Sequence, residues 1–144
     1  MGDRTSTWVD APPERVWGVL ADPRSYGEWV VGSRDIRRWD PEFPAAGTAF
    51  HHTFMVGPVP VKDSTSVLES EPPRHLVLRA RARPAGVAHI TLDLTPERDG
   101  TRVEIAERPV DGPPARWHNP VQQWLINRRN DESLRRLKRL AEQR

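Results

Sequence analysis

Residues 33–109 alternate apolar and polar side chains in short segments, the pattern typical of β-strands with one buried face. Proline, glycine or Asp-Gly separates neighbouring segments, and Asp99-Gly100 fits a two-residue hairpin turn. The expected strands lie at 5–11, 33–40, 47–57, 61–71, 75–83, 87–96 and 101–109. The pattern therefore predicts seven strands in an antiparallel meander.

The remaining segments have helical spacing. Residues 12–22 place Val16 and Leu20 on one face, and residues 23–32 form a second short helical segment that ends at Gly32. Asn119 followed by Pro120 is a typical helix start, and this last helix runs to near Gln143. Because a curved sheet must cover its apolar face, we expect an α+β helix-grip fold in which this helix lies against the sheet and leaves a cavity.

The alternation also assigns the faces of the strands. In residues 75–83 the inner set is Leu76, Leu78, Ala80 and Ala82, and in residues 87–96 it is Ala88, Ile90, Leu92 and Leu94. His89 and the arginines of 75–83 then lie on the outer, solvated face. In residues 101–109 the parity of Val103 and Ile105 carries Glu107 inward, where it is either a strand-end carboxylate in water or a polar group at the rim of the cavity.

The doublet His51-His52 is the clearest candidate for chemistry. Neighbours on a strand point to opposite faces, so parity sends His52 inward with Phe50 and Phe54, and His51 outward. A bulge near Gly47 would reverse this assignment. Once inside, His52 is either a hydrogen-bonded core residue or a group that binds a ligand or transfers a proton.

Two faces of the last helix compete for the sheet. One collects Asn119, Gln123, Ile126, Asn130, Leu134, Leu137 and Ala141, and the opposite one collects Trp117, Val121, Trp124 and Arg128. If the first face is buried, its amides need partners such as water or the polar part of a ligand. If the helix kinks or rotates, the tryptophan face packs instead.

Composition narrows the class of protein. The 144 residues suit one domain, 1–144, and six tryptophans supply much of the apolar surface. The chain has no cysteine and no apolar leader or membrane-length segment, so we expect a cytoplasmic protein without a membrane span. The net charge of +2 does not point to nucleic acid. No cofactor is expected, and no metal, because His51, His52 and His89 diverge.

Several phrases, "APPERVWGVLAD", "YGEWV", "GTAF", "VLESEPPRHLVLRA", "DGTRVEIAERP" and "RRNDESLRRLKRLAE", resemble the SRPBCC or START-like superfamily, in its polyketide cyclase/dehydrase and lipid-transport branch. The resemblance implies a helix-grip fold with a deep cavity for a small, largely apolar molecule. It carries no catalytic motif onto individual residues of this chain. Tyr26 is the only tyrosine and most sheet arginines have outward parity, which departs from the cyclases of the family.

The first functional hypothesis is therefore binding of a small hydrophobic or aromatic molecule between sheet and helix. The expected ligand-binding residues are Trp29, Phe50, Phe54, Leu78, Ile90, Leu92, Ile105, Gln123, Ile126 and Asn130. The alternative is a cyclase or dehydratase in which His52 is the general acid/base, Glu107 assists it and Asn130 or Gln123 polarises a carbonyl group. A third possibility is a protein-binding domain that uses exposed Trp124 or Trp39. The chain is expected to be a monomer or a homodimer.

Overall fold

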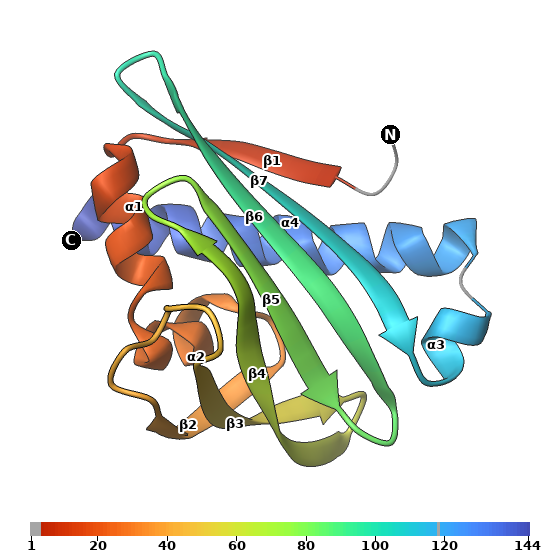
Figure 1. The fold of residues 1–144 in the computed structure, drawn as a ribbon. Helices are drawn as coiled ribbons and strands as arrows, with labels where there is room; N and C mark the ends of the chain where they lie inside the picture. Colours follow the sequence, from red (N-terminus) through yellow and green to blue (C-terminus); the bar gives the residue numbers. More distant parts are fainter. Residues whose placement is uncertain (1–3, 118) are drawn as a thin grey trace.

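The computed structural model describes residues 4–117 and 119–144, in which a seven-stranded antiparallel sheet curves around one long helix (Figure 1). The strands are β1 (Arg4–Val9), β2 (Ser33–Trp39), β3 (Ala49–Val56), β4 (Val59–Glu71), β5 (His75–Ala82), β6 (Gly86–Glu97) and β7 (Gly100–Asp111). Their order is β1-β7-β6-β5-β4-β3-β2. Strands β2 to β7 therefore form a meander, and β1 pairs with β7 at the edge of the sheet opposite β2. The predicted helix-grip architecture is confirmed.

Short helices connect the strands. Between β1 and β2 lie α1 (Pro13–Leu20), a 3₁₀ turn (Pro23–Ser25) and α2 (Tyr26–Trp29). The second helical segment is shorter than predicted and ends before Gly32, whose φ of +96° and close approach to Phe54 leave little room for a side chain. The four-residue α3 (Pro113–Arg116) was not predicted, because two prolines at its start interrupt any apolar periodicity.

The hairpin between β6 and β7 differs by one residue from the prediction. Its two loop residues are Arg98 and Asp99, both with positive φ, and Gly100 is already the first residue of β7. A Cβ atom on Gly100 would lie 2.3 Å from the carbonyl oxygen of Val9. Glycine is therefore required at this position by the close approach of β1, not by the turn itself.

The α4 helix (Pro120–Gln143) covers the inner face of the sheet and resolves the competition between its two faces (Figure 1). The side chain of Asn119 accepts a hydrogen bond from the backbone N–H of Gln122, as expected of an N-cap. Leu134 and Leu137 are fully buried at the C-terminal half, so they set the rotation of the helix. This rotation turns Asn130 inward and leaves Val121 and Trp124 in the N-terminal half 55–68% exposed, and Trp117, at the end of α3, is 68% exposed as well.

The core and the open space occupy different ends of the sheet. The buried cluster joins α1 and the C-terminal half of α4 to large inner side chains of the sheet, among them Leu76, Leu92 and Val103. Toward the N-terminal half of α4 these large inner side chains are replaced by smaller ones, and the sheet no longer fills the space beneath the helix.

Candidate functional site

A cavity of about 260 Å³ lies between the sheet and the N-terminal half of α4. Its apolar wall includes Phe50, Phe54, Val56, Ala80, Ala82, Val87, Ala88, Pro109, Pro114 and Ile126. Its polar or charged residues are Tyr26, Ser33, His52, Thr65, Arg81, Glu107, Gln122 and Arg129. An apolar concavity with a few converging polar groups is the usual form of a small-molecule site, and this volume lies just below the typical range of about 300–1,000 Å³.

Small residues on β5 and β6 create the space. The register pairs Ala80 with Ala88 and Ala82 with Gly86, so neither strand fills the interior at this end. Two residues before Ala80 in β5, Leu78 pairs with Ile90 and the core resumes. The change from leucine to alanine along one face of the β5–β6 hairpin therefore marks the wall of the cavity.

The side chain of His52 forms the middle of a buried polar row in this wall. His52 is 3% exposed, as strand parity predicts. Its Nδ1 lies 2.6 Å from Oγ of Ser33, and its Nε2 lies 3.0 Å from Oγ1 of Thr65. A neutral imidazole satisfies both contacts, because it offers one donor and one acceptor and each hydroxyl can take either role.

The environment of His52 keeps the ring uncharged. Burial, with smaller contributions from Arg37 and His51, lowers the pKa of His52 to about 4, although Asp63 acts in the opposite direction. Arg37 lies behind the strand and donates hydrogen bonds to the His52 carbonyl oxygen and to Oγ1 of Thr53. At neutral pH His52 is therefore a fixed hydrogen-bonding group and a weak base.

The lowered pKa of His52 predicts acid sensitivity. Between pH 6.5 and pH 4 the unfolded chain binds a proton at this residue and the folded chain does not, so stability falls as the pH is lowered through that window. The expected loss is about 3 kcal/mol by linkage. Urea unfolding at a series of pH values should show this loss in the natural chain and not in His52→Gln.

The comparison with His52→Gln is needed because other groups also titrate. A hydrogen bond to Asp93 raises the pKa of His75, so the stabilisation from His75 is present below pH 6.5 and is lost at higher pH. Parallel pH profiles for the natural chain and His52→Gln would contradict the assignment of the acid-sensitive group to His52.

A second polar group on the cavity wall joins β7 to α4. Glu107 is 8% exposed and forms an ion pair with Arg129, whose guanidinium also lies 5.7 Å from the ring centroid of Phe54. Among the described residues, the buried Oε1 atom of Gln122 has no hydrogen-bond partner. The wall near α4 thus combines a neutralised charge pair with an acceptor that a ligand can engage.

The structure separates the predicted site residues into two groups. Phe50, His52, Phe54, Glu107 and Ile126 all line the cavity. The other predicted residues are not in its wall: Trp29, Leu78, Ile90, Leu92, Ile105, Gln123 and Asn130. Leu78, Leu92 and Ile105 belong to the packed core, while Gln123 hydrogen-bonds to Asn127 and to the Glu107 carbonyl oxygen.

Some cavity residues were missed by sequence reasoning. Thr65 lies two residues before buried Val67, so the alternation along β4 indicates that it faces inward. The alternating alanines of β5 indicate an inner face, but their small size also indicates unfilled space, and that signal was missed. Ser33 and Arg129 had no such signal. Ser33 reaches His52 because β2 pairs with β3, and the position of Arg129 depends on the rotation of α4.

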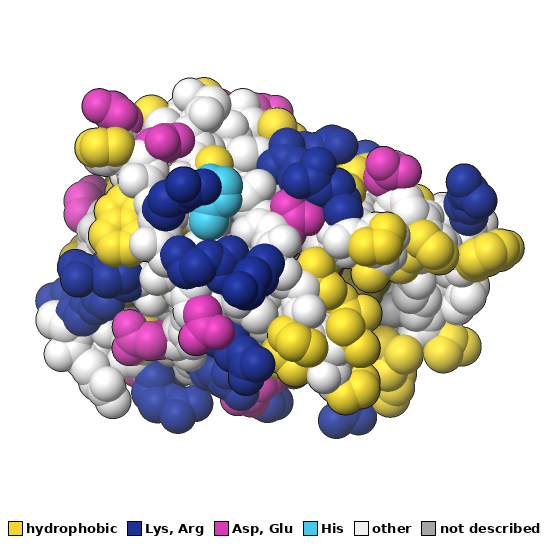
Figure 2. All heavy atoms as spheres, turned by 90° about the horizontal axis from the view of Figure 1, so that it is seen from below, with side chains coloured by type: hydrophobic (Ala, Val, Ile, Leu, Met, Phe, Trp, Pro, Cys, Tyr) yellow, Lys and Arg dark blue, Asp and Glu magenta, His cyan; other side chains and the backbone are white. Residues whose placement is uncertain are grey.

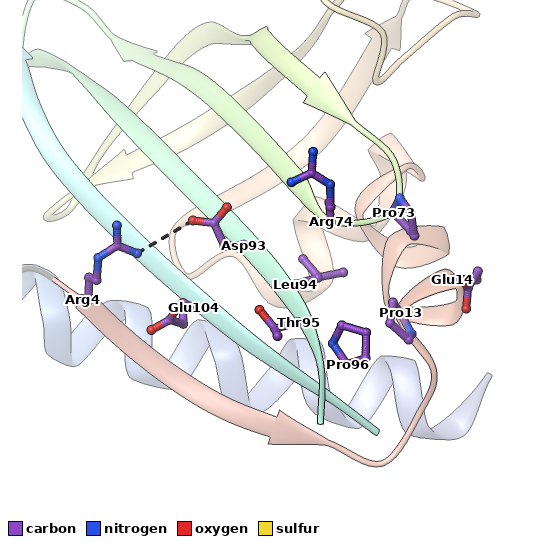
Figure 3. Close-up of a pocket in the computed structure, with 10 residues that line it drawn as sticks. All are labelled: Arg4, Pro13, Glu14, Pro73, Arg74, Asp93, Leu94, Thr95, Pro96 and Glu104. Atoms are coloured by element: carbon purple, nitrogen blue, oxygen red, sulfur yellow. Dashed lines mark ion pairs between the residues drawn. The ribbon is translucent and has the colours of Figure 1, made fainter. Parts of the chain in front are cut away.

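A wider depression lies on the side of the sheet away from α4 (Figure 3). Its volume is about 650 Å³, and charged side chains such as Arg4, Arg74, Asp93 and Glu104 line it. The Arg4–Asp93 contact is a half-exposed ion pair at 3.8 Å. Because this depression is open and its charges are partly paired, we regard the inner cavity as the better candidate for a small apolar molecule.

One acidic cluster among the described residues has the geometry of a cation site. Ligand atoms of Glu69, Glu71 and His75 lie within 4.8 Å of one another on the solvated side of β4 and β5. The His75 imidazole is already hydrogen-bonded to Asp93 and Glu69. Exposed clusters of this kind are common without an ion, and the expectation that the chain binds no metal stays a prediction.

Known proteins share both the sequence pattern and this architecture. Residues 4–142 match the family model described as polyketide cyclase / dehydrase and lipid transport. The chain belongs to this family. The resemblance seen in the sequence is thereby confirmed over nearly the whole chain. The chain matches none of the curated proteins with which it was compared.

Solved structures share the fold at low identity. Protein CV1439 from Chromobacterium violaceum has a TM-score of 0.72 at 22% identity, and the match covers 96% of each chain. The protein TTHA0849 from Thermus thermophilus has a TM-score of 0.72 at 17% identity, covering 96% of this chain and 94% of that one. The di-domain ARO/CYC StfQ of the steffimycin biosynthetic pathway has a TM-score of 0.72 at 12% identity, with 97% of this chain covering 50% of StfQ. At these identities the likeness is one of fold.

Proposed function

We propose that this member of the polyketide cyclase/dehydrase and lipid-transport family binds a small, mainly apolar molecule, ring-containing or aromatic, in the cavity beneath α4. The observation that carries the proposal is the wall itself, in which Ala80, Ala82 and Ala88 leave space that Phe50, Phe54 and Ile126 surround. Burial of an apolar molecule there removes its surface from water and fills a hollow that the protein leaves open.

Polar groups at two places in the wall support a ligand that also carries hydrogen-bonding atoms. The row of Ser33, His52 and Thr65 presents hydroxyls next to a neutral ring. Gln122 supplies an acceptor near Arg129 and Glu107. A hydroxyl or carbonyl group on an otherwise apolar ring can form hydrogen bonds with these groups and so keep its polar atoms paired when it is buried.

The alternative, a cyclase or dehydratase with His52 as general acid/base, has less support. An efficient catalytic base has a pKa near the working pH, whereas the pKa of His52 is lowered to about 4. Both of its ring nitrogens are engaged by hydroxyl groups of the protein. Glu107, the proposed assistant, is already paired with Arg129.

Ligand binding is tested by thermal unfolding with a panel of one- and two-ring alcohols and ketones, 2-naphthol among them. A ligand that fits the cavity should raise the melting temperature by about 5–10 °C at 100 times its Kd. Native mass spectrometry then gives the stoichiometry, with one molecule per chain expected. If no compound of the panel shifts the transition and the purified chain carries no bound molecule, the proposal is contradicted.

The cellular location belongs to the same proposal. None of the helices in residues 4–117 and 119–144 is long and apolar enough to cross a bilayer. A chain without cysteine is compatible with a reducing compartment, and we propose that the single domain, 1–144, is cytoplasmic and a monomer or homodimer.

A further inference from the structure

The large exposed hydrophobic side chains of the described residues concentrate on the elements that flank the cavity. Six of them form what we call the apolar rim: Val56, Val59, Trp117, Val121, Trp124 and Leu125, each 37–68% exposed. Val56 itself lines the cavity and pairs with Val59 across the β3–β4 hairpin. On α4, Leu125 and Val121 lie beside the lining residues Gln122 and Ile126.

Basic side chains accompany the apolar rim on α3 and α4. Residues 112–130 contain Arg116, Arg128 and Arg129 and no aspartate or glutamate, although exposed Asp111 and Asp131 flank this segment. Arg129 is paired with Glu107, so Arg116 and Arg128 carry the basic character of the surface. Arg128 is exposed and stacks on Trp124, with 5.1 Å between its guanidinium carbon and the ring centroid. Figure 2 shows hydrophobic side chains gathered over one half of a face and lysine or arginine side chains grouped beside them.

We propose that the apolar rim docks on the surface of an anionic lipid membrane and places the mouth of the cavity against the bilayer. Exposed tryptophan and leucine insert at the level of the headgroups, and nearby arginines are attracted to anionic lipids. This inference concerns an interaction surface and goes beyond the proposed function. It gives an apolar ligand a path between bilayer and cavity that avoids water.

The charge of the surface argues against a second copy of the chain as the occupant. A two-fold contact brings the same patch of both copies together. Arg116 and Arg128 of each copy would then enter a contact in which residues 112–130 offer no carboxylate, and the neighbouring Asp131 is already paired with Arg135. An anionic lipid surface, in contrast, complements both the apolar and the basic side chains.

Vesicle co-sedimentation tests the inference with the full chain. Vesicles of phosphatidylcholine with about 30% phosphatidylserine should bind the chain, pure phosphatidylcholine should bind it less, and about 0.5 M NaCl should weaken binding. The double variant Trp124→Ser/Leu125→Ser should lower the partition coefficient by about 30-fold, because two inserted side chains are lost. Arg128→Glu should lower it by about tenfold.

The chain offers matched controls for both changes. Trp39 and Leu68 are 39% and 41% exposed, and Trp39 is also stacked by an arginine, Arg24, at 5.6 Å. Trp39 pairs with Phe50, about 20 Å along β3 from Val56 at the usual rise per residue. Trp39→Ser/Leu68→Ser and Arg139→Glu, on the exposed distal part of α4, should bind vesicles as the natural chain does.

The outcomes separate this inference from the proposed function. The docking proposal would be overturned if the natural chain does not bind anionic vesicles, or if the control variants weaken binding as much as the rim variants do. A homodimer that the rim variants dissociate would instead assign the apolar rim to a second copy. Loss of vesicle binding in Trp124→Ser/Leu125→Ser with retained binding of 2-naphthol-type ligands would support a docking surface distinct from the cavity. Circular dichroism should confirm that these surface variants remain folded.

Discussion

Ala88→Phe is expected to abolish ligand binding in the cavity while the chain remains folded. Ala88 lies on β6 opposite Ala80, and both line the hollow beneath α4. A benzyl side chain at this position occupies the space that a one- or two-ring ligand needs, so Kd should rise by at least about 100-fold. Because the side chain enters an existing cavity, the free energy of unfolding should fall by less than the usual overpacking cost of about 1–3 kcal/mol.

The matched control for this substitution is Ala106→Phe. Ala106 lies on β7, one residue before Glu107, and therefore faces the solvated side of the sheet. It changes the same residue type in a neighbouring strand and should leave ligand affinity unchanged. Isothermal titration calorimetry with a ligand from the thermal panel compares the two variants. If Ala88→Phe binds as tightly as the natural chain, the ligand site lies elsewhere.

Phe50→Ala is expected to cause the largest loss of stability among the cavity residues. Phe50 is 1% exposed, and its ring centroid lies 4.8 Å from those of Tyr26 and His52 and 5.5 Å from that of Phe43. It therefore joins α2 and the loop before β3 to the cavity wall. Truncation should cost about 3–5 kcal/mol, a large part of the stability of an ordinary domain.

Phe54→Ala serves as the comparison, because Phe54 lies on the same face of β3, two residues beyond His52 and four beyond Phe50. Phe54 is half-buried and already borders open space, so its truncation should cost about half as much. Urea unfolding of both variants measures the difference. A cost for Phe50→Ala no larger than that for Phe54→Ala would contradict the view that this aromatic cluster stabilises the site.

The case of His52 shows which features of a site the local sequence pattern can predict. Parity along β3 was enough to separate the doublet, because successive side chains of a strand point to opposite faces wherever the strand runs. Strand parity could not predict the hydrogen-bond partners of His52. Ser33 and Thr65 lie 19 and 13 residues away in the sequence and meet the ring only through the pairing of β2, β3 and β4.

The same contrast applies to the ligand-binding residues. Leu78, Leu92 and Ala80 share one face in the sequence, but the structure places the two leucines in the core and Ala80 in the cavity wall. The difference arises from the part of α4 that each residue faces across the interior. Leu78 and Leu92 belong to the core cluster that includes Leu134 and Leu137 of α4, whereas the alanines face the part of α4 that carries Gln122 and Ile126.

By itself the sequence determined the seven strands and the long last helix, their order, the inner faces of β3, β5, β6 and β7 and the N-cap of the last helix. These features depend on backbone geometry and on side chains close together in the chain, so periodicity and capping residues are sufficient to predict them. Only the tertiary structure decided the rotation of α4, the place of the cavity, the ion pair of Glu107 with Arg129 and the exposure of the apolar rim. Each of these features depends on packing between elements that are distant in the sequence. In α4, the buried leucines of the C-terminal half fix the rotation of the whole helix, and that rotation decides which side chains the N-terminal half turns toward the sheet.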